Sequence, residues 1–181
     1  MRCFISAPLS EDILNYLFDV QNKLRKISKA KIRFVPKKQL HITLKFLGSI
    51  DGNKLKNIKN KLEEVKYDKF KLTLSKLGVF PNLNYARVLW VGVKEENIVI
   101  ELQKRIDEIL LGLFSKEQKF SAHITLGRIK NINDKEQFKK TLSNFKIEDK
   151  DSIIDRFELM ESVLRRDGAV YNVLEIYKLK Q

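Results

Sequence analysis

Hydrophobic and polar positions along this chain follow two periods, one typical of strands and one typical of helices. Alternating or β-rich stretches cover residues 2–7, 40–48, 70–80, 86–93, 120–129, 153–164 and 170–179. Large apolar residues at helical spacing cover residues 11–27, 51–65, 95–113 and 133–145. Ser10, Asp51 and either Asn133 or Asp134 stand where helix N-caps are expected, and residues 166–168 read as a hairpin turn. The pattern predicts an α+β protein.

The order of these elements is repeated along the chain. First strands begin near residues 2 and 86, first helices near 10 and 95, second helices near 51 and 133, and third strands near 70 and 153, so that each offset is 82 to 85 residues. We therefore predict one bilobed domain over residues 1–181 with pseudo-twofold symmetry. Its lobes are duplicated β-α-β-α-β units at about 2–80 and 86–164, with a closing strand at 170–179. Antiparallel sheets should face a central cleft, with the helices outside.

The tetrapeptide HITL occurs once in each half, at residues 41–44 and 123–126, and the two copies contain both histidines of the chain. Side chains on a strand alternate between its faces. His41 and Thr43 should therefore share one face while the aliphatic residues point the other way, and the same holds for His123 and Thr125. Packing of the two copies about a twofold axis would bring the polar faces together across a cleft.

Two imidazoles and two hydroxyls around one cleft suit phosphate chemistry. Histidine titrates near neutral pH, so that one imidazole can act as a base while the other acts as an acid, and threonine hydroxyls can donate hydrogen bonds to phosphate oxygens. Arg128, five residues beyond His123, would face away from it on a regular strand. Gly127 is expected to mark a bulge that turns Arg128 back toward the same anion.

Plainer interpretations of these residues stay open at this point. Both histidines could be structural, the threonines could be ordinary strand formers, and Arg128 could be a surface charge. A metal site would need a third ligand, and the sequence contains no cysteine cluster and no HxH or HExxH spacing. Cys3 is expected to be a small buried residue.

Charge and composition point to an anionic partner and away from a membrane. The formal net charge is +13, which attracts polyanions such as RNA, although a solvated lysine-rich surface would explain the same number. The chain contains no apolar run of about 18 residues and no signal-peptide pattern at its N-terminus. Its single cysteine excludes an intrachain disulfide. We expect a cytoplasmic protein.

Both motifs and their flanks resemble the 2H phosphoesterase superfamily, and within it the RNA 2′,3′-cyclic phosphodiesterase family, first named 2′-5′ RNA ligase. Ala122 stands where the family commonly has proline. Phe34 stands where the family commonly has tryptophan, and we expect Phe34 to be a core residue. The stretches that carry the resemblance are RCFISAPLSEDI, QLHITLKFLG, LGVFPNLNYARVLWVGV, FSAHITLGRI and ESVLRRDGAVYNVLEIYKL.

The resemblance implies an enzyme that opens RNA-terminal 2′,3′-cyclic phosphates to 2′-phosphates without a metal or other cofactor. It implies that His41 is the proton donor, His123 the proton acceptor, and Thr43, Thr125 and Arg128 the phosphate-binding residues. Expected substrates include tRNA fragments, 2′-5′ ligation would be a weak reverse reaction, and the protein should be a monomer. The rival hypotheses are a module that binds RNA ends without turnover and a phosphodiesterase for 2′-5′ oligonucleotides or cyclic nucleotides.

Overall fold

The computed structural model describes residues 1–166 and 168–181 and confirms the α+β class. Strand β2 and the short 3₁₀ helix η1 were not predicted, and the strand expected at 153–164 is interrupted at Asp155. The predicted hairpin turn includes Asp167, which lies outside the described residues, while its neighbours Arg165 and Gly168 pair across the hairpin. In chain order the elements are β1 (Arg2–Pro8), α1 (Glu11–Ile27), β2 (Ala30–Phe34), η1 (Lys37–Gln39), β3 (His41–Ser49), α2 (Gly52–Leu62), β4 (Phe70–Phe80), β5 (Val88–Val93), α3 (Glu96–Ile109), β6 (His123–Ile132), α4 (Lys135–Asn144), β7 (Asp151–Ile154), β8 (Arg156–Arg165) and β9 (Gly168–Lys178).

The strands form one antiparallel sheet whose two arms meet at its centre. The strand order is β7-β4-β5-β6-β3-β1-β8-β9, with β2 paired to β6. The arms join where β3 and β6 pair at Ile42 and Ile124. The two lobes therefore share a single curled sheet, and the two HITL strands are its central neighbours.

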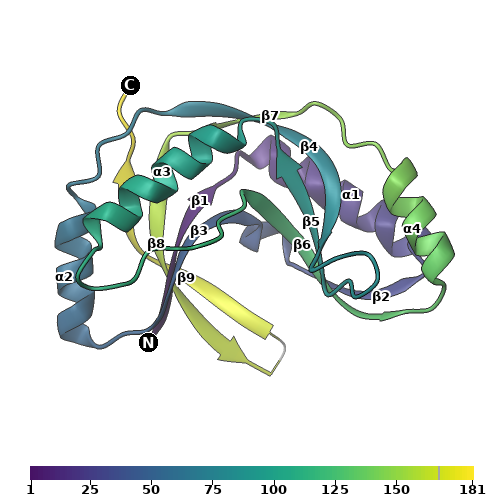
Figure 1. Ribbon diagram of the computed structural model, residues 1–181, viewed down its shortest axis with the longest axis horizontal. Helices are drawn as coiled ribbons and strands as arrows, with labels where there is room; N and C mark the ends of the chain where they lie inside the picture. The colour runs from purple at the N-terminus through teal and green to yellow at the C-terminus, as the bar shows by residue number, and fades with distance from the viewer. Residues whose placement is uncertain (167) are drawn as a thin grey trace.

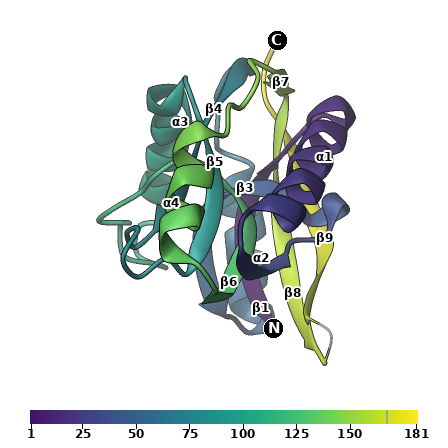
Figure 2. The ribbon, with the colours of Figure 1, turned by 90° about the vertical axis from the view of Figure 1, so that its right-hand side faces the viewer.

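Each arm of the sheet combines strands from both sequence repeats. Strand β4 follows the first HITL strand but pairs with β5, and β8 follows the second HITL strand but pairs with β1. The helices cross over in the same way: α2 and α3 lie beside the arm of β1, β8 and β9, whereas α1 and α4 lie beside the other arm (Figure 1). The β8–β9 hairpin extends beyond the helices at one end of the molecule (Figure 2).

One hydrophobic core runs behind the sheet through both arms. Ile42, Leu44, Ile124 and Leu126, the aliphatic side of the two HITL strands, are at most 1% exposed. Burial of such a side chain stabilises the fold by about 1.5–3 kcal/mol. The same alternation that buries these residues leaves the polar residues of the motif on the opposite face.

Helix caps follow the sequence expectation at two of three positions. Asp51 accepts a hydrogen bond from the backbone N–H of Lys54 at 2.8 Å, and Asp134 accepts one from Gln137 at 2.9 Å. Ser10 occupies the N-cap position of α1, but its side chain makes no capping hydrogen bond. None of the helices in the described residues is long and apolar enough to cross a membrane.

A buried ion pair attaches the first motif strand to α3. Lys45, next to the HITL motif, pairs with Asp107, and both side chains are about 5% exposed or less. Lys45 also donates to the Ser115 carbonyl at 2.9 Å, while the Glu117 backbone N–H donates to Asp107 at 2.8 Å. Burial raises the pKa of Asp107, but hydrogen bonds from Lys45, Glu117 and Gln103 outweigh it and lower the pKa overall. This network fixes β3 against the helix and the loop that follows it.

Candidate active site

The two HITL segments lie side by side with the same pattern of exposure. Ile42 and Ile124 face each other in the antiparallel β3–β6 ladder. Continuing the ladder by one residue in each direction sets His41 beside Thr125 and Thr43 beside His123. In both segments the histidine and threonine are partly exposed and the aliphatic residues are buried. The structure thus brings together all four polar side chains singled out from the sequence.

Each imidazole is oriented by the same backbone contact. Nδ1 of His41 lies 2.7 Å from the Gln39 carbonyl oxygen, and Nδ1 of His123 lies 2.8 Å from the Ser121 carbonyl oxygen. A carbonyl can only accept a hydrogen bond, so Nδ1 must carry the proton in both rings. Nε2 is then the nitrogen that can gain or lose a proton. In His41 it lies 3.0 Å from the Thr43 hydroxyl.

Aromatic rings hold the first imidazole from two sides. Phe4 stacks on His41 with ring centroids 5.1 Å apart, and Tyr171 meets its edge at 5.6 Å. Phe4 comes from β1 and Tyr171 from the closing strand β9. Neither was expected at the site, because a single sequence does not reveal which distant strand flanks β3.

The second imidazole has a corresponding aromatic pair. Phe80 meets His123 edge-on at 4.9 Å, and the Trp90 ring centroid lies 6.2 Å away. Trp90 is the single tryptophan of the chain. Its indole lies so close to Gly78 that a Cβ there would overlap the ring. The rarity of tryptophan was a signal that the sequence interpretation did not use.

Burial lowers the pKa of both histidines. For His41, loss of solvent is the largest cause, and repulsion from His123 adds to it, while the hydrogen bond to Gln39 acts in the opposite direction. For His123, loss of solvent outweighs the hydrogen bond to Ser121. Both shifts favour neutral imidazoles in the free protein at neutral pH. An anion bound between the rings would favour protonation again.

Arg128 shares the face of the histidines, and the expected bulge is present. Along β5, Gly92, Trp90 and Val88 pair with His123, Thr125 and Arg128, with a register shift between Trp90 and Leu89. The partners on β5 are two residues apart and so point the same way. The extra residue between Thr125 and Arg128 therefore turns the exposed Arg128 toward the histidine side.

The first motif strand contains a matching irregularity, which the sequence interpretation missed. Along β1, Pro8, Ser6 and Phe4 pair with His41, Thr43 and Phe46, with a register shift between Ser6 and Ile5. Phe46 therefore lies on the histidine face, at the position equivalent to Arg128, and its side chain is 74% exposed. No glycine marks this bulge as Gly127 marks the other. An aromatic residue and an arginine thus occupy equivalent places on the two strands.

Three residues noted in the sequence are structural. Phe34 packs against the core and carries the Arg25 guanidinium 4.7 Å above its ring. Ala122, before the second motif, is buried. Cys3 is buried as expected, and burial raises the pKa of its thiol.

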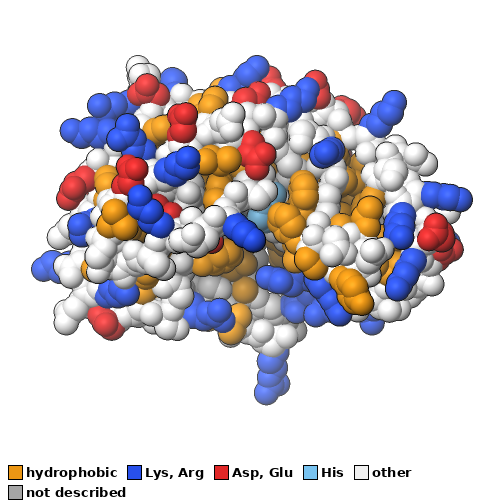
Figure 3. Space-filling model, viewed as in Figure 1, with side chains coloured by type: hydrophobic (Ala, Val, Ile, Leu, Met, Phe, Trp, Pro, Cys, Tyr) orange, Lys and Arg blue, Asp and Glu red, His pale blue; other side chains and the backbone are white. Residues whose placement is uncertain are grey.

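The histidines lie in a hollow on one face of the molecule. Figure 3 shows histidine atoms between the two arms, with hydrophobic side chains beside them and lysine and arginine side chains around the opening. No group of three His, Cys, Asp or Glu side chains suited to a metal ion occurs in the described part of the chain. The hollow combines two titratable rings, two hydroxyls and a guanidinium, a set that suits acid–base chemistry on a phosphate ester.

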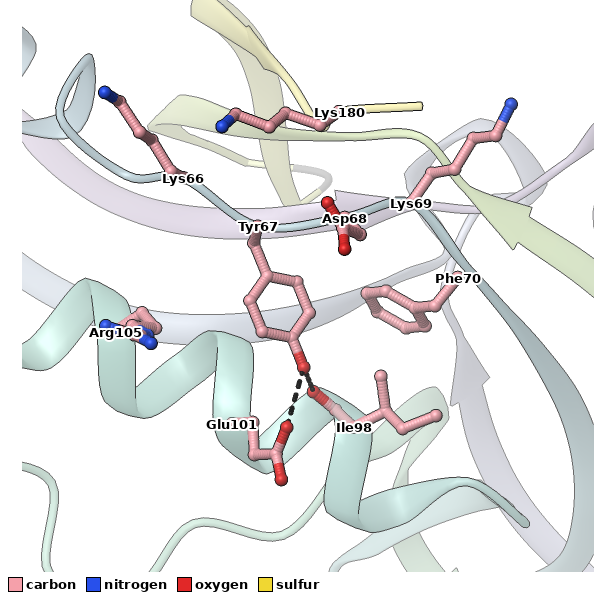
Figure 4. A pocket seen from close by; sticks show the side chains of 9 residues that line it. All are labelled: Lys66, Tyr67, Asp68, Lys69, Phe70, Ile98, Glu101, Arg105 and Lys180. Atoms are coloured by element: carbon pink, nitrogen blue, oxygen red, sulfur yellow. Dashed lines mark hydrogen bonds between the residues drawn. The ribbon is translucent and has the colours of Figure 1, made fainter.

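A cavity of about 470 Å³ lies elsewhere, between the β4 end of the sheet and α3, and includes neither histidine. Lys66, Lys69 and Lys180 extend outward from its rim (Figure 4). The Tyr67 hydroxyl points inward and lies 3.0 Å from the Ile98 carbonyl oxygen and 3.1 Å from a Glu101 carboxylate oxygen, either of which can accept its proton. Its polar group is satisfied within the protein, so we assign this cavity no chemistry.

The chain belongs to the LigT-like phosphoesterase family. The family model matches the chain twice, at residues 7–90 and at residues 91–171.

Curated relatives and solved structures agree with this membership. The chain is 36% identical to an RNA 2′,3′-cyclic phosphodiesterase of Methanocaldococcus jannaschii over 97% of this chain and 99% of the relative. It is 31% identical to one of Archaeoglobus fulgidus over 98% and 100%. Among solved structures, a Thermus thermophilus protein matches with a TM-score of 0.83, 25% identity and coverage of 99% and 98%. E. coli LigT shares the fold with a TM-score of 0.79 at 23% identity, over 99% and 98%.

Proposed function

We propose that this protein hydrolyses the 2′,3′-cyclic phosphate at the 3′ end of RNA and leaves a 2′-phosphomonoester. Relatives that match nearly the whole chain are named RNA 2′,3′-cyclic phosphodiesterase. The observation that carries the proposal is the pair of imidazoles on adjacent strands. Each has Nδ1 bound to a backbone carbonyl, so that Nε2 is available for proton transfer.

The proposed reaction is an in-line displacement with two proton transfers. His123 removes a proton from water as the water oxygen bonds to phosphorus. The bond between phosphorus and the 3′-oxygen breaks, and His41 gives its proton to that oxygen. The product keeps its phosphate on the 2′-oxygen. The expected weak 2′-5′ ligation would use the same two proton transfers, with the 5′-hydroxyl of another RNA in place of water and the 3′-oxygen again as the leaving group.

Three further side chains stabilise the charge that develops on the phosphoryl oxygens. Thr43 is beside His123 and Thr125 beside His41 when the ladder is continued from Ile42 and Ile124, and from there their hydroxyls can donate to an anion. Arg128 adds a guanidinium on the same face, which suits bidentate contact with phosphate. Catalysis needs neither a metal nor another cofactor in this scheme. The RNA source, including tRNA fragments, the monomeric state and the cytoplasmic location stay predictions.

The test uses an oligoribonucleotide with a terminal 2′,3′-cyclic phosphate, incubated in EDTA, with separation of the 2′- and 3′-phosphate products. We expect turnover in chelator and a 2′-phosphate product. His41→Ala and His123→Ala should each lower the rate about 10²–10⁴-fold. The double variant should lose far less than the product of the two effects, because the groups act together.

A substrate with a p-nitrophenolate leaving group separates the roles of the two histidines. This leaving group needs no proton, so that His41→Ala should recover much of its activity while His123→Ala should not. The opposite result would exchange the donor and acceptor. Binding of the RNA end without any turnover would support a binding module, and activity that requires added zinc or manganese would support a metal site. Circular dichroism of each variant controls for folding.

A further inference from the structure

The loop between β4 and β5 carries an exposed aromatic ring on the arm of the sheet that holds His123. Phe80 and Val88 pair at the base of this loop, and the Phe80 ring meets His123 edge-on at 4.9 Å. Tyr85, near the end of the loop, is 71% exposed. A tyrosine with so much of its surface in solvent adds little to the core, and its ring is accessible to a ligand.

Hydrogen bonds within the loop fix its backbone. The side-chain oxygen of Asn82 accepts from the backbone N–H of Asn84 at 3.0 Å and from that of Tyr85 at 3.1 Å. The Arg87 N–H donates to the Phe80 carbonyl at 2.7 Å and closes the loop. The Tyr85 ring is thus held on an ordered turn, so that a ligand which stacks on it loses little free energy to ordering of the backbone.

A pocket of about 200 Å³ lies beside this ring, and its charge is of one sign. Its polar lining residues are Asn84, Tyr85, Arg87, Lys130, Asn131 and Lys135. Among the described residues that line it, none is acidic, whereas the cavity beside α3 includes Asp68 and Glu101. An aromatic face next to several cations suits single-stranded nucleic acid, because its bases stack and its phosphates need positive partners.

Strands β5 and β6 connect this pocket to the histidines. On β5, Gly92 pairs with His123, while Ala86, six residues earlier, lines the pocket, about 20 Å away along the strand. On β6, Lys130 follows Arg128 by two residues, and both are exposed while the residue between them is buried. Lysine and arginine side chains extend from the opening over this part of the molecule (Figure 3). One nucleotide is too short for this span, but a strand of several nucleotides reaches from His123 to the pocket.

We propose that this surface, the Tyr85 pocket, binds the RNA strand whose 5′-hydroxyl replaces water in 2′-5′ ligation. This inference rests on the proposed function, in which His123 takes a proton from the nucleophile and His41 protonates the leaving 3′-oxygen. In-line attack sets the nucleophile opposite the leaving oxygen. The strand with the cyclic phosphate therefore belongs on the arm of His41, and the attacking strand on the arm of His123, where the Tyr85 pocket lies.

The Tyr85 pocket acts on ligation without touching the reacting atoms. The 5′-oxygen of the attacking strand bonds to phosphorus, and its proton passes to His123. The bond between phosphorus and the 3′-oxygen breaks, and His41 protonates that oxygen. A strand held in the pocket presents its 5′-hydroxyl at a raised effective concentration, which lets it compete with water. Hydrolysis uses water and does not need the pocket.

The first experiment measures the binding of 3′-labelled oligoribonucleotides with a free 5′-hydroxyl by fluorescence anisotropy, with saturating 2′-AMP on the arm of His41. The wild-type Kd should fall with length up to about four nucleotides and then level off. Tyr85→Ala should raise the Kd of the tetranucleotide about tenfold, the equivalent of one lost stacking contact, and leave that of a dinucleotide unchanged. Tyr85→Trp should keep the wild-type affinity. Lys130→Ala should lower the slope of log Kd against log salt by about 0.7.

The second experiment compares ligation with hydrolysis. At limiting concentrations of a tetranucleotide with a 5′-hydroxyl, Tyr85→Ala should ligate it to a cyclic-phosphate RNA about tenfold more slowly than the wild type. Hydrolysis of adenosine 2′,3′-cyclic phosphate should keep its kcat and KM. Phe18→Ala removes an exposed ring on α1 and Lys104→Ala an exposed cation on α3, and these controls should change neither reaction.

The outcomes distinguish this inference from the function on which it rests. Equal affinity of the wild type and Tyr85→Ala for the tetranucleotide, with normal hydrolysis in both, would overturn the Tyr85 pocket and leave the phosphodiesterase intact. A raised KM of Tyr85→Ala for a cyclic-phosphate RNA, with unchanged affinity for the 5′-hydroxyl strand, would assign the pocket to the other strand and overturn the inference. Absence of wild-type hydrolysis would overturn the proposed function and, with it, the assignment of the two arms.

Discussion

At the scale of single residues, the site depends on the protonation of two imidazoles. Backbone carbonyls fix which nitrogen of His41 and His123 is protonated, and burial makes the second proton harder to add. The proposed reaction nevertheless needs one ring charged and one neutral at the same moment. Binding of the anionic substrate should favour this protonated ring, because the negative charge stabilises an imidazolium beside it.

The lowered pKa of the histidines in the free protein, and its expected rise when an anion binds, predict different pH profiles for kcat/KM and kcat. Because the pKa of both histidines is lowered, the singly protonated pair should predominate below the ordinary histidine pKa of about 6.5. We expect kcat/KM to form a bell with its maximum on the acid side of about pH 6.5, and kcat to reach its maximum at higher pH. Initial rates across the range from about pH 4.5 to 8.5 test this. A kcat/KM that keeps rising above neutrality would contradict it.

The position of Arg128 predicts that its removal weakens stabilisation of the transition state. Arg128→Ala should cost about 2–4 kcal/mol of transition-state stabilisation, seen as a lower kcat/KM, if the guanidinium acts as an oxyanion donor. Arg128→Lys should recover only part of this loss, because the bidentate contact is missing. Arg105→Ala removes an exposed arginine on α3 and is the matched control. Steady-state kinetics with a mononucleotide substrate measure the effect. Equal rates for Arg128→Ala and wild type would show that the phosphate contact is elsewhere.

At the scale of elements, the β4–β5 pair builds the wall behind His123. Gly78 on β4 pairs with Trp90 on β5, and the indole occupies the space that a side chain at Gly78 would need. The same indole lies against Phe80 and His123, with centroid distances of 5.1 and 6.2 Å. The absence of a side chain at Gly78 thus leaves room for the indole that lies beside the His123 imidazole.

Gly78→Ala should therefore displace the Trp90 indole and disturb His123. We expect destabilisation of about 1–3 kcal/mol, as for other overpacked sites, together with reduced kcat and a shifted tryptophan emission. Gly52→Ala, at the start of α2 with open space around its Cβ position, is the control that should leave all three unchanged. Thermal unfolding and fluorescence measure these effects. Wild-type stability and emission in Gly78→Ala would show that the position of the indole does not depend on Gly78.

At the scale of the whole molecule, charge acts outside the cleft. The protein carries 36 Lys and Arg against 23 Asp and Glu. Lysines surround even the cavity that lies away from the histidines. A field of this sign raises the rate of encounter with RNA without specifying the site of cleavage.

This surface predicts different salt dependence for long and short substrates. A long RNA releases many counterions on binding, so that its log affinity should fall steeply with log salt, whereas a cyclic mononucleotide should show a shallow slope. Competition binding over a salt series gives both slopes. Equal slopes would restrict the contact with RNA to the catalytic hollow.

Local properties of this chain could be predicted from its sequence because they depend on backbone geometry alone. Alternation on a strand assigned His41 and Thr43 to one face and their aliphatic neighbours to the core, and the structure buries Ile42 and Leu44 accordingly. Gly127 indicated the bulge that turns Arg128 toward the histidine side, because glycine is common where a strand is irregular. Lys45, at the corresponding place in the first strand, gave no such signal, so that the orientation of Phe46 was missed.

The sequence by itself therefore determined the α+β class, the duplicated HITL strands, the polar face of each, and a surface that attracts polyanions. Tertiary structure alone decided that β4 and β8 exchange arms, that Phe4, Tyr171, Phe80 and Trp90 lie against the imidazoles, and that Phe46 faces the same side as the histidines. The reason is physical. Periodicity is a property of neighbouring residues, whereas strand partners and register depend on packing across the whole sheet, where one extra residue reverses the face of every residue beyond it.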